Sequence, residues 1–263
     1  MDIALNTYSL RNEWNLLGAK PYNIIGAFCR DLGITKMEIL DHHFTPESLP
    51  AIQKELAENG VKIFALAPHT KILATPHEVK TQIANGTQTL QLARSIGAEV
   101  IRVQVGDGPL PKIFPPVPDF DEEEQAAYEE QIAEAIEITA QVTEPLIEVA
   151  EQTGVKIGIE THHSYSSNYL YMEAFNKRFP SKMIGWTFDI GNYENDEMRW
   201  KGLNAIKYRM MYLHAKAYAF NAEGLETKLD FPRVAQTLHE TGFHGTWSIE
   251  FEGHMHGFLG TVS

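Results

Sequence analysis

The stretch Lys156-Ile157-Gly158-Ile159-Glu160-Thr161-His162 decides the fold, because it is a short apolar run that ends on a carboxylate. Three further runs end on an acidic residue or a histidine: Gly185-Trp186-Thr187-Phe188-Asp189, Met211-Tyr212-Leu213-His214 and Thr246-Trp247-Ser248-Ile249-Glu250. In a parallel α/β protein the carboxyl ends of the strands all point to one face. Four side chains that reach this face from four strands can converge on one divalent metal ion. The sequence therefore predicts a metal-dependent enzyme.

The same unit, a short apolar run followed by a break and an amphipathic segment, occurs eight times along the 263 residues. Before the four runs quoted above, strands are expected at 2–6, 36–40, 61–66 and 99–105. Helices are expected at 21–32, 46–59, 76–96, 122–152 and 230–241, and several of them stop near a glycine. Eight alternating units without a linker predict a single (β/α)₈ TIM-barrel domain over residues 1–263.

Two segments depart from this regular pattern. Residues 106–121 carry five prolines and are predicted to form either a lid over the barrel mouth or a surface insertion without a role. After Glu250 only Phe251 to Ser263 remain, which is too short for a complete last helix. The last helix is therefore expected to be short or missing, either because the chain is truncated or because a partner subunit takes its place. A homo-oligomer is the expected assembly.

Composition excludes several classes of partner. The apolar content of 43% allows a sizeable core, and the net charge of −13 repels nucleic acid and anionic membranes. The one cysteine, Cys29, cannot form an internal disulfide. The N-terminus shows neither a signal peptide nor an apolar run long enough to span a membrane. A cytoplasmic enzyme that binds neither nucleic acid nor a membrane is expected.

Four motifs carry a resemblance to a known family: Ile-Glu-Thr-His at 159–162, Phe-Asp-Ile-Gly-Asn at 188–192, Leu-His-Ala-Lys at 213–216 and Ile-Glu-Phe-Glu-Gly at 249–253. With these motifs in this order, the chain resembles the xylose-isomerase-like superfamily of TIM barrels. That superfamily includes sugar isomerases, ketose 3-epimerases, inosose dehydratases and endonuclease IV. The resemblance implies that Glu160, Asp189, His214 and Glu250 bind one Mn²⁺, Mg²⁺ or Co²⁺. It also implies that Glu160 and Glu250 act as an acid/base pair on the substrate. Three carboxylates and one imidazole form a hard, anionic site that favours Mn²⁺ or Mg²⁺ over structural zinc.

Three positions depart from the ketose 3-epimerase pattern. Ser166 stands where a second glutamate is usual, Asn192 where a histidine is usual and Phe220 where an arginine is usual. The expected reaction is therefore an isomerisation or epimerisation of a sugar, keto-sugar or polyol by proton transfer through an enediolate. A lyase or dehydratase that acts on a keto-sugar or keto-glycoside is the alternative. A non-catalytic sugar-binding barrel and an AP endonuclease are expected less.

Other polar residues are predicted to face the same mouth. His162 and Lys216 follow the ligands Glu160 and His214 by two positions, and on an extended strand residues two apart share a face. We expect His162 to be a second acid/base group or substrate ligand, and Lys216 to polarise the substrate. The predicted substrate-binding residues are Tyr8, Glu38, His69, Gln104 and Asn192. No phosphate-binding motif occurs, which favours an unphosphorylated substrate.

Overall fold

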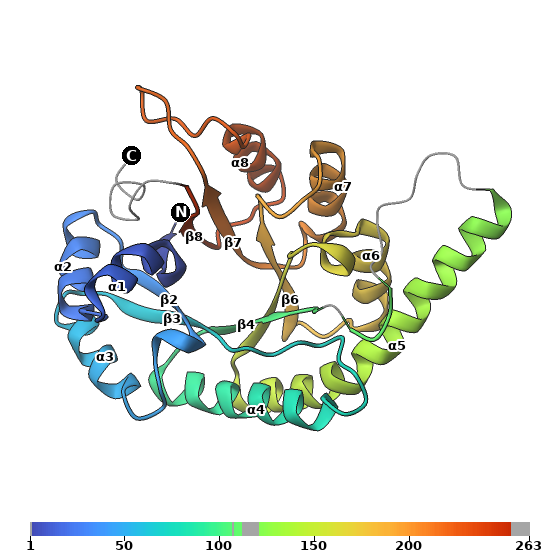
Figure 1. Cartoon of the computed structure of the whole chain (residues 1–263), viewed down its shortest axis with the longest axis horizontal. Helices are drawn as coiled ribbons and strands as arrows, with labels where there is room; N and C mark the ends of the chain where they lie inside the picture. Colours follow the sequence, from blue (N-terminus) through green and yellow to red (C-terminus); the bar gives the residue numbers. More distant parts are fainter. Residues whose placement is uncertain (1, 107, 112–120, 254–263) are drawn as a thin grey trace.

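The computed structural model describes residues 2–106, 108–111 and 121–253. Eight parallel strands close into one barrel, with neighbours in chain order from β1 to β8, and helices surround it (Figure 1). The predicted TIM barrel is confirmed. The strands are β1 (Asp2–Asn6), β2 (Lys36–Leu40), β3 (Lys62–Ala67), β4 (Val100–Gln104), β5 (Lys156–Glu160), β6 (Ile184–Asp189), β7 (Met210–Ala217) and β8 (Thr246–Phe251).

The helices that connect the strands are α1 (Arg11–Leu17), α2 (Tyr22–Asp31), α3 (Leu49–Ala57), α4 (Val79–Ile96), α5 (Glu122–Thr153), α6 (Tyr169–Arg178), α7 (Asp196–Ile206) and α8 (Phe231–Glu240). Three short 3₁₀ turns follow strands: η1 (Thr7–Leu10), η2 (Asp41–His43) and η3 (Ser164–Ser167). Helix α1 and these turns were not expected from the sequence. Helix α3 begins three residues later than expected, because Thr45 and Ser48 bond to each other in a turn that precedes it.

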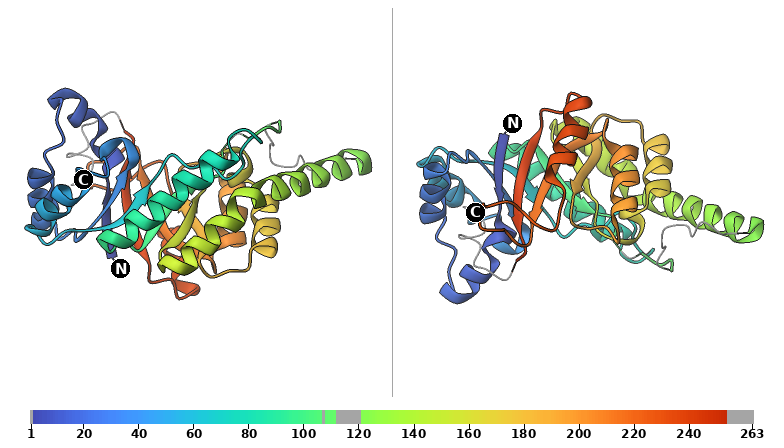
Figure 2. Two further views of the ribbon diagram at one scale, coloured as in Figure 1. Left: turned by 90° about the horizontal axis from the view of Figure 1, so that it is seen from below. Right: turned by 90° about the horizontal axis from the view of Figure 1, so that it is seen from above.

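Helix α5 begins at a capping box, in which the Asp121 side chain accepts from the backbone N–H groups of Glu123 and Glu124. Its N-terminal part extends away from the barrel, as Figure 2 shows. Most of the proposed lid, residues 112–120, lies outside the described residues, so the lid stays a prediction. None of the described helices is long and apolar enough to span a membrane.

Strand register places the predicted site residues side by side at the carboxyl ends of the strands. Gln104 pairs with Glu160, Asp189 with His214, and Lys216 with Glu250. Below them, a small apolar cluster that includes Ala4, Phe64, Val100 and Tyr212 packs between the strands. The larger core lies between the strands and the helices. The described chain has no helix after β8, and residues 254–263 lie outside the described range.

Candidate active site

The four predicted ligands meet at one point in the barrel mouth. Glu160, Asp189, His214 and Glu250 each offer one ligand atom, and these atoms all lie within 4.8 Å of one another. All four residues are buried, with at most 5% of their surface exposed. They converge because each stands at or near the carboxyl end of its own strand, where the parallel barrel gathers side chains. The geometry suits a single cation with carboxylate and imidazole ligands.

A buried carboxylate from β2 holds the imidazole of His214. Glu38 is fully buried, and its Oε2 lies 3.0 Å from His214 Nε2. A proton on Nε2 satisfies this contact and leaves the lone pair of Nδ1 directed at Glu160, Asp189 and Glu250. Carboxylates commonly fix metal-binding histidines in this way. The sequence predicts Glu38 as a substrate ligand. The structure shows its contact with His214, and a contact with substrate stays a prediction.

Two side chains of β4, Arg102 and Gln104, hold the ligand Glu160. Arg102 donates from Nη1 to Glu160 Oε2, and its Nε donates to Glu38 Oε1 at 2.9 Å. Gln104 Nε2 donates to the same Glu160 oxygen at 3.1 Å. One oxygen of Glu160 is thus fixed by two donors, and the other oxygen, Oε1, lies 3.4 Å from His214 Nδ1.

Lys216 reaches the ligands as the strand alternation predicts. Its Nζ lies 3.0 Å from Asp189 Oδ2 and 3.4 Å from Glu250 Oε2, and it donates to Asn192 Oδ1 at 3.1 Å. Asn192 also donates to Asp189 Oδ2 at 2.9 Å, so its amide joins the lysine and the ligand. Gly191 is required here, because a Cβ at this position would lie 2.5 Å from Lys216 Cδ. The Asp-Ile-Gly-Asn motif therefore binds and positions the Lys216 side chain.

The charge of the centre fits a divalent ion. Four buried carboxylates, Glu38, Glu160, Asp189 and Glu250, face two buried permanent cations, Arg102 and Lys216. With His214 neutral, two negative charges remain, and a divalent cation neutralises them. Two buried atoms of the centre, His214 Nδ1 and Glu250 Oε2, have no hydrogen-bond partner within the described chain. Buried polar atoms are rarely left so, and both of these are possible metal ligands.

Electrostatics favours ionised carboxylates in most of this cluster. Burial alone would raise the pKa of Glu160, but the guanidinium of Arg102 and the imidazole of His214 lower it to about 2. Burial likewise opposes ionisation of Glu250, yet His214 outweighs it and lowers the pKa well below its usual range. At Asp189 burial prevails and raises the pKa. Burial also opposes a charge on His214, but the surrounding carboxylates raise its pKa, so a metal ion at Nδ1 would have to displace a proton.

The remaining predicted residues lie at different distances from this centre. Tyr8 is half-buried, and its pKa is raised by burial and by the carboxylate of Glu252, which itself lies 3.2 Å from Lys216. His69 is exposed beyond the end of β3. His162 is also exposed, because β5 ends at Glu160 and the strand alternation does not extend to it. Substrate and catalytic roles for these residues stay predictions.

The sequence analysis did not single out His163, the next residue. Its backbone has φ 57° and ψ 174°, and Ser164 follows with φ 47°. Residues other than glycine rarely adopt a positive φ, and residues with such a strained backbone cluster at functional sites. Burial lowers the pKa of the His163 imidazole, and the charges of His162 and Lys216 lower it further. In the sequence, the one signal for His163 is that it directly follows another histidine, His162. In the structure the two rings are 5.0 Å apart.

Two of the three residues that depart from the epimerase pattern, Ser166 and Phe220, contact neighbouring residues. Ser166 is buried, and its hydroxyl accepts from the His162 backbone N–H and donates to the His163 carbonyl. Phe220 stacks on Phe251, with ring centroids 6.2 Å apart. These two positions therefore stabilise loops and do not supply the charges that the epimerase pattern has there.

Comparison with known proteins agrees with this geometry. The model of the xylose isomerase-like TIM barrel family matches residues 27–258. The chain therefore belongs to this family, as its motifs predict. No curated protein matches the sequence.

Solved structures share the fold at low sequence identity. The 3-keto-D-glucoside 4-epimerase from E. coli has a TM-score of 0.70 at 12% identity, with 99% of this chain and 96% of the other covered. The IOLI protein, solved with a zinc atom, has a TM-score of 0.65 at 16% identity, with 95% and 88% covered. Mannonate dehydratase from Streptococcus suis has a TM-score of 0.62 at 17% identity, with 95% and 84% covered. These likenesses show the fold, which serves epimerases and dehydratases alike.

Proposed function

We propose that this protein is a divalent-metal-dependent isomerase or epimerase that moves a proton on a sugar, keto-sugar or polyol. The observation that carries the proposal is the buried set Glu160, Asp189, His214 and Glu250, whose ligand atoms lie within 4.8 Å of one another. The two excess negative charges and the two unpartnered atoms support a divalent ion. Mn²⁺ is the favoured metal because hard oxygen ligands predominate, and Mg²⁺ or Co²⁺ are alternatives.

The two glutamates have unequal roles in this proposal. A divalent ion at this centre would act as a Lewis acid for negative charge that develops on a substrate oxygen. We assign the proton acceptor to Glu250 and not to Glu160, because Glu250 Oε2 has no hydrogen-bond partner in the described chain. Glu160 is the opposite member of the pair, but Arg102 and Gln104 already bond to its Oε2. We assign Glu250 the removal of the proton from carbon. Glu160 delivers a proton on the opposite side once it has itself taken one up.

Lys216 and Tyr8 are the side chains that we propose to orient the substrate. The Lys216 ammonium lies 3.4 Å from Glu250 Oε2, where it can donate a hydrogen bond to a hydroxyl or carbonyl next to the reacting carbon. Gln104 and Asn192 bond to ligand oxygens of Glu160 and Asp189, so we propose that they hold these ligands in addition to any substrate contact.

A lyase or dehydratase is the second candidate. The position of the Lys216 ammonium, 3.4 Å from Glu250 Oε2, favours it. Elimination requires a base at one carbon and an acid for the oxygen that leaves from the next. Glu250 and the neighbouring Lys216 ammonium offer this pair, and both reactions begin with the same loss of a proton. Ser166 and Phe220, which replace charged residues of the epimerase pattern, add weight to this alternative.

The experiment uses the full chain, stripped of metal with EDTA and reloaded with Mn²⁺. It is incubated in D₂O with a panel of keto-sugars and keto-glycosides, and products are followed by proton NMR. Deuterium at the carbon next to the carbonyl together with an epimer or isomer supports the first candidate, and an unsaturated product supports the second. No exchange and no product from any compound, with or without Mn²⁺, refutes both and leaves a sugar-binding barrel.

We also propose a homo-oligomer. Large apolar side chains are exposed on α1 and α2, including Leu16 at 75%, Leu17 at 61% and Ile24 at 58%. Clusters of exposed apolar residues commonly mark protein interfaces. Light scattering coupled to gel filtration tests this, and a monomeric mass across a concentration series refutes it.

A further inference from the structure

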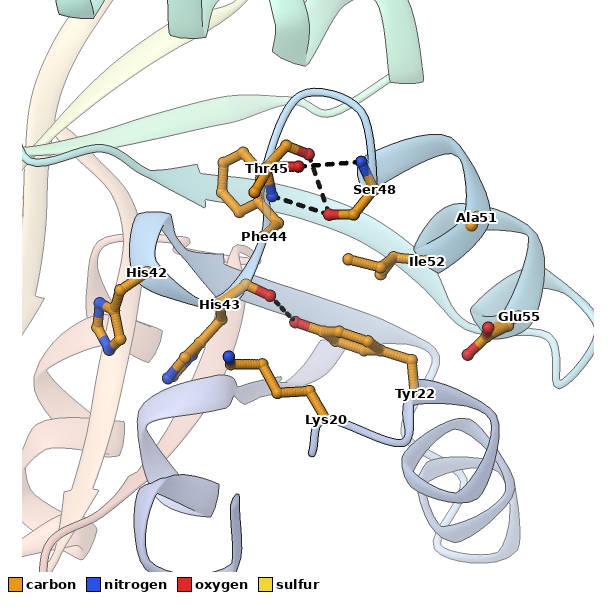
Figure 3. A pocket seen from close by; sticks show the side chains of 10 residues that line it. All are labelled: Lys20, Tyr22, His42, His43, Phe44, Thr45, Ser48, Ala51, Ile52 and Glu55. Carbon is orange, nitrogen blue, oxygen red and sulfur yellow. Dashed lines mark hydrogen bonds between the residues drawn. The ribbon is translucent and has the colours of Figure 1, made fainter. Parts of the chain in front are cut away.

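A groove opens at the barrel mouth where β1 and β2 end. It consists of two adjoining pockets of about 400 and 460 Å³, which share Lys20, His42 and His43. Figure 3 shows the first pocket, with Tyr22, Phe44 and Ile52 around it. Volumes of this size are typical of small-molecule sites.

The groove lies next to the proposed metal centre. Two consecutive residues at the end of β1 contact the two sites: Asn6 Nδ2 lies 3.4 Å from Glu250 Oε1, and Thr7 Oγ1 lies 2.9 Å from His43 Nδ1. Arg11 lines the second pocket and donates to the carbonyl of Phe251, the neighbour of Glu250, at 2.6 Å. The two sites are therefore neighbours on either side of Asn6 and Thr7.

The lining of the groove suits a ligand rich in hydroxyls. Phe44 is half-buried and offers aromatic surface, and the buried Tyr22 and Ile52 also line the pocket (Figure 3). Lys20 is exposed and makes no hydrogen bond or ion pair with the described residues, so its ammonium is a free donor. Glu55 places a carboxylate on the same pocket. Opposite charges argue against an anion, whereas sugar hydroxyls both donate and accept, and sugar rings pack on aromatic side chains.

We propose that this groove binds a glycosyl ring, so that the substrate of the metal centre is a glycoside with a second sugar ring and not a free monosaccharide. This inference rests on the proposed function for the reacting part of the substrate. The binding of the second ring rests on the groove alone, and it is therefore tested separately from turnover.

The decisive variant fills the first pocket without removing a contact. Ala51 is exposed on α3 and lines the pocket, so Ala51→Phe places a ring in it. Ala57→Phe is the matched control, because Ala57 is exposed on the same helix and lines neither pocket. Lys20→Ala, compared with Lys80→Ala on the exposed surface of α4, tests the free ammonium. Circular dichroism verifies that all four variants fold.

Binding of cellobiose, maltose and glucose to the Mn²⁺-loaded full chain is measured by saturation-transfer NMR and calorimetry. We expect one of the disaccharides to bind more tightly than glucose. Ala51→Phe should weaken that binding about tenfold or more, while Ala57→Phe leaves it unchanged. Neither disaccharide binding, or equal binding to Ala51→Phe and wild type, overturns the inference.

Kinetics separates failure of the subsite from failure of the proposed reaction. Ala51→Phe should lower kcat/KM for a keto-glycoside about tenfold and leave that for the free keto-sugar unchanged. Equal effects on the two substrates overturn the subsite although the reaction stands. Disaccharide binding that is sensitive to Ala51→Phe, in a protein that turns over nothing, supports the subsite and overturns the reaction.

Discussion

Replacing Glu38 with glutamine distinguishes two roles for this carboxylate, holding His214 for a metal or contacting the substrate. Glu38 Oε1 accepts from Arg102 at 2.9 Å and from Tyr212 at 2.8 Å. Its Oε2 accepts from Ser248 at 2.9 Å and lies 3.0 Å from His214 Nε2. Glutamine keeps the shape but turns one of these oxygens into a donor.

The geometry indicates where the new amide nitrogen goes. At Oε1 it would face the Arg102 guanidinium, which cannot act as an acceptor. At Oε2 it faces the Ser248 hydroxyl, which can rotate, and His214 Nε2, which can accept only if its proton moves to Nδ1. That tautomer blocks the ring nitrogen directed at the metal. We therefore expect Glu38→Gln to weaken Mn²⁺ binding 10- to 100-fold, the usual effect of losing such a partner, or about 1.4–2.7 kcal/mol.

The metal-free protein should also lose stability. The substitution removes a buried carboxylate from Arg102, and breaking a buried ion pair costs about 3 kcal/mol. The assay is a calorimetric Mn²⁺ titration of EDTA-stripped protein, with urea unfolding in parallel. Ser248→Ala is the control, because it removes one neutral donor and leaves the charge. It should cost about 1 kcal/mol and leave Mn²⁺ affinity unchanged. Wild-type Mn²⁺ affinity in Glu38→Gln, combined with a raised KM, refutes the positioning role and restores the predicted contact with substrate.

Three further predictions address catalysis, strain and pH. Glu250→Gln should retain its metal and lose ~10²-fold in kcat, whereas Lys216→Ala should lower kcat/KM with metal content unchanged. If Glu250→Gln turns over at a near-normal rate and His162→Ala is inactive, His162 and not Glu250 is the base, and the lyase is favoured. His163→Gly should raise the unfolding free energy by about 1 kcal/mol by relieving its positive φ, while activity falls; a destabilised variant in urea unfolding contradicts the strain. Burial lowers the pKa of His43 to about 3, below its unfolded value of about 6.5, so the unfolded chain takes up the proton first as the pH falls. Between pH 7 and pH 5 wild type should lose about 2 kcal/mol of stability that His43→Gln does not lose, and parallel slopes in urea unfolding would show otherwise.

Period-two alternation carried most of what the sequence could predict. Each ligand ends an apolar run, and the barrel brings strand ends together, so the cluster followed from local pattern and topology. Lys216 followed as well, because β7 continues to Ala217 and keeps residues 214 and 216 on one face. Applied backwards, the same rule would have found Tyr212 and Ser248, which stand two residues before His214 and Glu250 and bond to Glu38.

Contacts that depend on where a strand stops could not be predicted from the sequence. β5 ends at Glu160, so His162 leaves the alternation and His163 turns through a left-handed conformation. Depth in the barrel is also invisible in one sequence. Glu38 was expected to contact the substrate, and in the structure it bonds to Arg102, Tyr212, His214 and Ser248.

The contacts of Arg102 explain why the two glutamates of the centre differ. This one guanidinium bonds to Glu160 and to Glu38, and Glu38 in turn holds His214. Two ligands from β5 and β7 are therefore fixed through a shared arginine before any metal binds, and fixed groups need no reorganisation during a reaction. Arg102 does not bond to Glu250, which lies 3.4 Å from Asn6 and from the Lys216 ammonium and 3.3 Å from His214 Nδ1. A proton acceptor has to change its charge and its hydrogen bonds during turnover, which the held Glu160 resists and Glu250 allows. The structure thus favours Glu250 as the group that starts the reaction, whichever of the two reactions follows.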